Sequence, residues 1–223
     1  MNFVKQSWWK ILAVILVFYT IIGGFLFEAP RLAIVNETIR NLYFHVPMWF
    51  AMVTMLLIST IYSIKYLNKR NSLHDVVANE FANVGILLGI LGLSTGSIWA
   101  RFTWGAWWVN DPQLNAAAIG VLIYLAYAVL RNSIEDDQKR GTVSGVYNIF
   151  AFAAFVPLIF VLPRLADNSL HPGKGGNPGF NAYDLDSKLR MVFYPAVVGW
   201  ALLGVWLASL GIRMKALYLK RED

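Results

Sequence analysis

Six long apolar stretches constrain the fold of this chain more than any other feature of its sequence. They lie at residues 9–27, 43–66, 82–101, 114–131, 145–163 and 192–212. A helix needs about 20 apolar residues to cross the hydrocarbon core of a bilayer. Because the stretches use most of the 223 residues, we predict an all-α integral membrane protein with six transmembrane helices and a single domain over residues 1–223.

The composition supports the bilayer as the solvent of this chain. Hydrophobic residues make up 57% of it and charged residues only 14%, whereas an ordinary soluble domain has about a quarter of its residues charged. The net charge of +6 could suggest a nucleic-acid partner. However, basic residues also orient membrane proteins, and no basic cluster is interleaved with aromatic residues. We therefore expect membrane lipid, and no nucleic acid, as a partner.

The distribution of Lys and Arg predicts the orientation. Both termini and the segments after the second and fourth stretches carry twelve of these residues, and the other side carries seven. The positive-inside rule places the richer side, with both termini, in the cytoplasm. The segments expected to face outward cover residues 28–42, 101–113 and 164–191, and those expected to form inner loops cover residues 67–81 and 132–144.

Four of the nine tryptophans fall within a run of ten residues at the second outer segment. They are Trp99, Trp104, Trp107 and Trp108, with Asp111 and Pro112 shortly after them. An aromatic belt at the membrane interface explains one or two tryptophans, but a belt is spread over all helix ends. A concave apolar wall would suit a large planar ligand. The spacing therefore slightly favours a ligand platform over a belt, in a loop over residues 99–114.

The chain has three histidines and no cysteine. His74 falls on the predicted cytoplasmic side, whereas His45 and His171 both fall on the outer side, before and after the tryptophans. Either one alone is best interpreted as a hydrogen-bonded structural residue, but two on one side favour paired metal ligation. Neutral imidazole binds haem iron axially. Zinc would normally need two more ligands, so haem between two imidazoles fits better.

The charged residues near these groups allow two interpretations each. Arg101, Arg164 and Lys174 could pair with the two propionates of haem, since Arg forms bidentate pairs with carboxylates, or they could merely snorkel at helix ends. Asp111 could orient a histidine or cap the helix expected after it. The third stretch has glycines at fourfold or threefold spacing, which favour tight helix packing; they are Gly85, Gly89, Gly92 and Gly96.

The segment from Gly96 to Leu114 resembles the tryptophan-rich "WWD" signature, which marks haem-handling proteins of cytochrome c maturation. The Tyr-Phe-His-Val-Pro run at 43–47 and the Leu-His-Pro-Gly run at 170–173 make the chain similar to the haem exporter protein C family, the C component of the system I pathway. The resemblance covers all six stretches.

The resemblance implies a bacterial inner-membrane protein that binds haem b on its periplasmic face. His45 and His171 would be the axial ligands, and the implied cofactor-binding residues are Trp99, Arg101, Trp104, Trp107, Trp108, Asp111 and Pro112. The family presents haem to a periplasmic haem chaperone. It works with the ATPase and membrane subunits of an ABC transporter and a small single-span accessory subunit. Any catalysis would be lyase-like assistance of haem attachment to the chaperone, with no classical catalytic residue.

Two positions depart from the signature, because Asn110 and Gln113 stand where the family usually has its second Trp and an Arg. One stacking surface and one charge partner are thereby lost, which affects chaperone contact more than haem binding. Two alternatives stay open. A system II cytochrome c synthetase shares the WWD signature, but no histidine falls at mid-depth in these stretches, which argues against it. A non-haem scaffold or quinone-binding subunit is the second.

Overall fold

The described part of the chain is helical throughout. The computed structural model describes residues 7–29, 36–166, 169–171 and 185–222, and within these it contains no strand. The elements are α1 (Trp8–Leu26), the 3-10 helix η2 (Asn36–Asn41), α2 (Leu42–Lys69), α3 (Ser72–Trp104), α4 (Pro112–Asn132), α5 (Asp137–Phe160), α6 (Leu162–Leu165) and α7 (Ser187–Glu222).

Within the described residues, six helices are long and apolar enough to cross a membrane, which confirms the predicted number. They are α1, η2 with α2, α3, α4, α5 with α6, and α7. Each of the six predicted stretches falls on one of them. Only 28% of the apolar window of α1 and 22% of that of α5 is buried inside the protein, so both helices present broad apolar faces to their surroundings.

The predicted inner loops at 67–81 and 132–144 are wrong, because helices fill most of both ranges. α2 ends at Lys69 and α3 begins at Ser72, where Asn71 caps the new helix by accepting a hydrogen bond from the Leu73 amide at 2.9 Å. Asp136 similarly caps α5. Hydropathy marks the apolar part of a helix, whereas its ends lie at the capping residues, several residues further into polar sequence.

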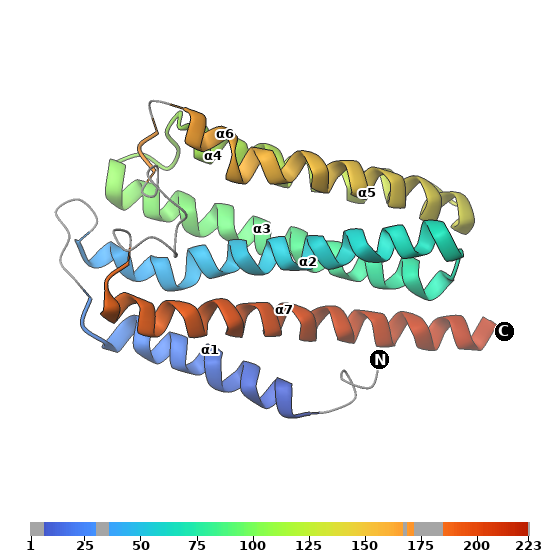
Figure 1. Cartoon of the computed structure of the whole chain (residues 1–223), viewed down its shortest axis with the longest axis horizontal. Helices are drawn as coiled ribbons and strands as arrows, with labels where there is room; N and C mark the ends of the chain where they lie inside the picture. The colour runs from blue at the N-terminus through green and yellow to red at the C-terminus, as the bar shows by residue number, and fades with distance from the viewer. Residues whose placement is uncertain (1–6, 30–35, 167–168, 172–184, 223) are drawn as a thin grey trace.

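The tryptophan segment is also more helical than predicted. α3 continues to Trp104 and α4 begins at Pro112, so the loop covers only residues 105–111. Gly105 ends α3 with a positive φ of 78°, a conformation that suits glycine. We call the end of the bundle that holds this loop the tryptophan end. The α2–α3 and α4–α5 connections lie at the opposite end (Figure 1).

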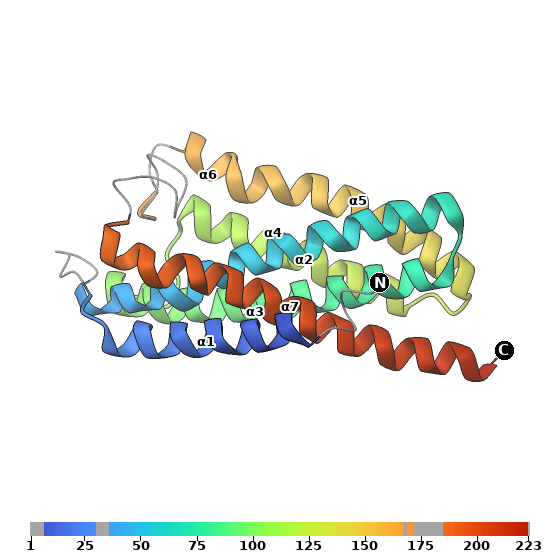
Figure 2. The same ribbon diagram turned by 60° about the horizontal axis from the view of Figure 1, so that its bottom comes forward.

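The helices form two groups joined through α2 and α3. α1 packs on α7, α7 on α2, and α2 along α3, while α4 and α5 pack together on the other side (Figures 1 and 2). The glycines of α3 allow the close approach that their spacing predicted: a Cβ on Gly85 would lie 2.6 Å from Leu56 of α2. Beyond the tryptophan end of α1, Lys188 forms an ion pair with Glu28 at 2.7 Å, and this hydrogen bond lowers the pKa of Glu28.

Polar contacts also cross the bundle away from the tryptophan end. Arg131 of α4 forms two hydrogen bonds with the Asp75 carboxylate of α3, at 2.8 and 2.6 Å. Asn148 of α5 is fully buried and donates hydrogen bonds to Ser59 and Ser63 of α2 at 2.7 and 2.9 Å. In a bilayer, where no water satisfies buried polar groups, such contacts fix which helix faces meet.

Candidate functional site

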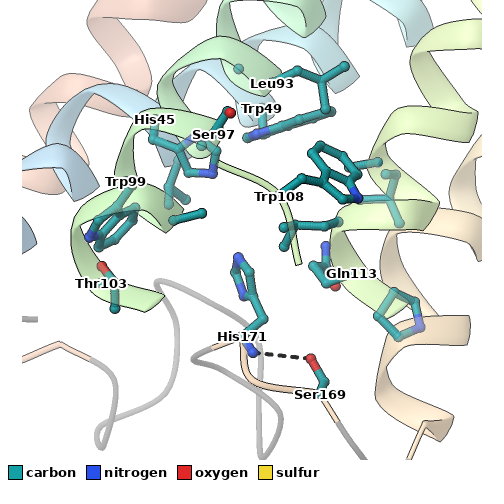
Figure 3. Close-up of a pocket in the computed structure, with 18 of the residues that line it drawn as sticks. His45, Trp49, Leu93, Ser97, Trp99, Thr103, Trp108, Gln113, Ser169 and His171 are labelled. Carbon is teal, nitrogen blue, oxygen red and sulfur yellow. Dashed lines mark hydrogen bonds between the residues drawn. The ribbon is translucent and has the colours of Figure 1, made fainter. Parts of the chain in front are cut away.

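A cavity of about 430 Å³ opens at the tryptophan end, between the α2–α3 pair and helices α4, α5 and α6. This volume falls in the range of small-molecule sites, about 300–1,000 Å³. Most of its wall is apolar and much of it is aromatic, from Trp49, Phe50, Trp99, Trp104, Trp108 and Phe160. Figure 3 shows both predicted histidine ligands at this space.

His45 lies in the first turns of α2 and is buried, with 8% of its surface exposed. Its ring meets the Trp99 ring edge-on, with centroids 5.8 Å apart and an angle of 79° between the planes. The ring of Trp49, one helical turn along α2, lies at 6.3 Å. His45 also lines the cavity. Its orientation is therefore set by packing on two sides.

A hydrogen bond further fixes the His45 ring. Its Nδ1 atom lies 3.1 Å from the Thr95 hydroxyl of α3, and that hydroxyl lies 2.9 Å from the Leu91 carbonyl. Thr95 has one hydroxyl hydrogen, which the carbonyl accepts. The Thr95 oxygen is then the acceptor for Nδ1–H of His45, and Nε2 keeps its lone pair. This is the tautomer that a metal-binding imidazole needs, held by a hydrogen bond to its other nitrogen.

Two glycines of α3 make room for these rings. A Cβ on Gly96 would lie 2.7 Å from Cε1 of His45, and a Cβ on Gly92 would lie 2.9 Å from the Trp49 ring. Both glycines also line the cavity. Besides the helix packing that their spacing predicted, these two glycines therefore also shape the wall around His45.

His171 lies in the short described segment 169–171 that follows α6. Its ring points into the cavity from below in Figure 3, toward the space under His45. The His171 amide donates a hydrogen bond to the Ser169 hydroxyl at 3.2 Å. The structure thus brings together, at one cavity, two histidines that are far apart in the sequence.

Three of the four clustered tryptophans line the cavity, namely Trp99, Trp104 and Trp108. Trp107 does not, and it is 59% exposed. Figure 3 shows Trp99 and Trp108 on opposite sides of the space between the histidines. Trp99 donates its indole hydrogen to Thr38 of η2 at 3.1 Å. Such hydrogen bonds satisfy the polar edge of an indole ring and leave its faces for apolar contact.

The indole of Trp108 is held by α4. It donates to the Asn115 side chain at 3.3 Å, and Asn115 in turn donates to the side chain of Asn110 at 2.7 Å. Asn110 is one of the two departures from the WWD signature. It offers no ring for stacking here, but through Asn115 it supports a tryptophan that lines the cavity.

Asp111 and Pro112 form the start of α4 and do not line the cavity. Asp111 is buried, and its Oδ1 atom accepts hydrogen bonds from the amides of Gln113 and Leu114 at 2.8 and 3.3 Å. Pro112 occupies the first turn of α4, where a missing N–H costs nothing. The predicted capping role of Asp111 is confirmed.

The outer arginines differ in position. Arg164 of α6 lines the cavity, as does Gln113, the second departure from the signature. Arg101 is exposed, donates a hydrogen bond to the Gly105 carbonyl and is not part of the cavity wall. Lys174 and the glycine-rich run at 172–179 lie outside the described residues.

Sequence reasoning missed several residues of the site. Trp49 had a usable signal, because it stands four residues after His45 and thus on the same helix face. Thr95 and Ser169 had none, since their partners lie 50 or more positions away.

Within the described ranges, no group of three or more His, Cys, Asp or Glu could hold a metal ion. Two imidazoles facing an aromatic cavity fit a haem better than a bare metal.

The comparisons with known proteins point in one direction. A family model described as "Heme exporter protein C" matches residues 2–222. The chain is 27% identical to the heme exporter protein C of Rhodobacter capsulatus, over 96% of this chain and 83% of that protein. It is 27% identical to that of Paracoccus denitrificans, over 84% and 76%. It is 23% identical to that of Escherichia coli K12, over 96% and 85%.

Proposed function

The chain belongs to the heme exporter protein C family, and we propose that it binds haem b at its tryptophan end and presents it to a periplasmic haem chaperone. Family membership supports a role in haem handling for cytochrome c maturation. His45 and His171 are the proposed axial ligands. The observation that carries this assignment is that both rings point into one cavity whose other walls are largely apolar and include several aromatic rings.

The remaining lining residues have roles that follow from their chemistry. The faces of Trp99, Trp104 and Trp108 pack against the macrocycle, where apolar burial supplies most of the binding energy. Arg164 pairs with a propionate, since a guanidinium binds a carboxylate through parallel hydrogen bonds. Gln113, which stands in place of the Arg of the signature, offers its side-chain amide to the propionate edge of the haem.

Presentation to the chaperone is a matter of position. Trp107 is 59% and Phe102 72% exposed beside the cavity wall, so the rim carries apolar rings that a chaperone can contact. A haem held with one edge at this rim meets the acceptor histidine of the chaperone in a fixed geometry, which lowers the entropic cost of reaction. This is lyase-like assistance without a catalytic acid or base from this chain.

The proposed assembly lies in the bacterial inner membrane. The excess of Lys and Arg on the side of the termini supports a periplasmic position for the haem cavity. The broad apolar faces of α1 and α5 fit membrane lipid, the membrane subunit of an ABC transporter and a small single-span accessory subunit. The transporter's ATPase subunit supplies the energy for release of the haem-loaded chaperone.

The absorption spectrum of protein purified in mild detergent from haem-producing cells tests the proposal. We expect the six-coordinate, low-spin spectrum of bis-histidine haem, and its loss when both His45→Ala and His171→Ala are introduced. His74→Ala is the matched control, because His74 lies at the opposite end against the Tyr62 ring, and it should keep the spectrum. A low-spin spectrum in the double variant would contradict the ligand assignment, and colourless wild-type protein would favour a non-haem scaffold.

A further inference from the structure

The carboxylate of Asp111 connects two parts of the site that are distant in sequence. Its Oδ1 atom caps α4, as described above. Its Oδ2 atom accepts hydrogen bonds from the Ser169 hydroxyl at 2.9 Å and from the Leu170 amide at 2.7 Å. Only 1% of Asp111 is exposed. A buried carboxylate needs several donors to replace its water, and these four provide them.

The chain of contacts continues to His171. The Ser169 hydroxyl donates to Asp111. It also accepts from the His171 amide at 3.2 Å, a hydrogen bond drawn as the dashed line in Figure 3. The amides of Leu170 and His171 are therefore tied to the start of α4, the first directly and the second through Ser169. The position from which the His171 ring enters the cavity depends on these three hydrogen bonds.

We propose that Asp111 is a positioning residue that holds the His171 segment in register with His45, and that it does so without touching haem. The proposal rests on the axial role of His171. It gives the aspartate of the WWD signature a defined task in this protein: Asp111 does not line the cavity, whereas the histidine that it positions does.

A carboxylate is required because both of its oxygens accept. An asparagine caps a helix about as well as an aspartate, but its amide has one accepting oxygen and one donating nitrogen. Asp111→Asn therefore cannot cap α4 and also accept from Leu170 and Ser169. Ser169→Ala removes the link to the His171 amide and leaves the α4 cap intact.

The test compares Asp111→Asn and Ser169→Ala with the matched control Asp136→Asn, which changes a capping aspartate at the other end of the molecule. Haem titration in detergent should show about 10- to 100-fold weaker binding in the first two variants, the usual effect of losing a residue that orients a ligand. Their spectra should shift toward five-coordinate haem, and added imidazole should restore the low-spin spectrum, as it should in His171→Gly. Asp136→Asn should match the wild type.

Wild-type affinity and spectrum in both Asp111→Asn and Ser169→Ala would overturn the proposal. A second outcome would also overturn it: added imidazole restores the low-spin spectrum in His171→Gly but in neither Asp111→Asn nor Ser169→Ala. That result would indicate that the cavity itself has collapsed in these two variants. A haem-independent measurement separates this proposal from the function itself. In the haem-free protein, Asp111→Asn should speed hydrogen exchange at the Leu170 amide, and unchanged exchange there would overturn the positioning role even if the wild type binds haem.

Discussion

At the scale of single residues, two arginines at the tryptophan end show that charge alone does not define a ligand contact. Arg101 stands at the C-terminal end of α3, where the helix dipole stabilises a cation. Its side chain donates a hydrogen bond to the Gly105 carbonyl. Arg164 is the one arginine or lysine in the described wall of the cavity. With Gln113 replacing the Arg of the signature, Arg164 is left as the proposed partner for a propionate.

We expect Arg164→Gln to weaken haem binding by about tenfold or more, because a hydrogen bond to a charged group contributes about 1.5–3 kcal/mol. Arg101→Gln should leave the dissociation constant unchanged. Titration with haem measures both. Repeating the titration with haem dimethyl ester, which has no free carboxylate, should abolish the difference between the variants. A loss that persists with the ester would assign Arg164 a role in packing.

At the scale of helices, one buried polar chain connects three elements. Asn148 of α5 donates to Ser59 of α2, and Ser59 donates to the Ala78 carbonyl of α3 at 2.6 Å. The α2–α3 pair carries His45 and its supports, and α5 continues toward α6 and the His171 segment. The hydrogen bonds of Asn148 thus fix the α5 wall of the cavity relative to the α2–α3 wall, from a position away from the tryptophan end.

Asn148→Ala should lower the free energy of unfolding in detergent by about 1–2 kcal/mol, since interhelical hydrogen bonds in membranes contribute about 0.6–2 kcal/mol each. Loss of helical signal during denaturant titration measures the change. Phe150→Ala on the same helix is the control, because Phe150 is 71% exposed to the surroundings and should have a small effect. Equal destabilisation by both substitutions would show that the polar contact contributes nothing specific.

The helices and their caps also show how much of the fold and of the site can be predicted from the sequence. The six spans follow from apolar runs, and the cap at Asp111 follows from an aspartate before a Pro and an apolar helix. Loop bounds did not follow, because helices end at caps and not where hydropathy falls. The partners of His45 and Asp111 did not follow either. Thr95 and Ser169 are ordinary hydroxyl residues until the fold brings them within hydrogen-bonding distance.

At the scale of the whole molecule, the two ends of the bundle differ in chemistry. The tryptophan end holds the aromatic cavity and the exposed Lys188–Glu28 ion pair, and the opposite end holds the Arg131–Asp75 and Lys215–Glu80 ion pairs. The bias of Lys and Arg predicts that the end opposite the cavity lies in the cytoplasm. The absence of cysteine allows each end to be labelled through a single introduced thiol.

A membrane-impermeant maleimide should label Phe102→Cys in intact spheroplasts and Glu135→Cys only after the membrane is permeabilised. Both side chains are exposed and lie at opposite ends of the bundle. The cysteine-free wild type is the blank. The reverse labelling pattern would place the cavity on the cytoplasmic side and would contradict a periplasmic site for haem.

The separation of the two histidines along the chain also orders events during biosynthesis. A protein is made from its N-terminus, and His45 belongs to α2 whereas His171 follows α6. A nascent chain that ends after α4 already contains His45, Trp99 and Trp108, but neither the second histidine nor the serine that ties it to Asp111. On the proposed ligand assignment, bis-histidine capture of haem therefore follows synthesis of the fifth span, because a fragment that ends earlier has only one of the two proposed ligands.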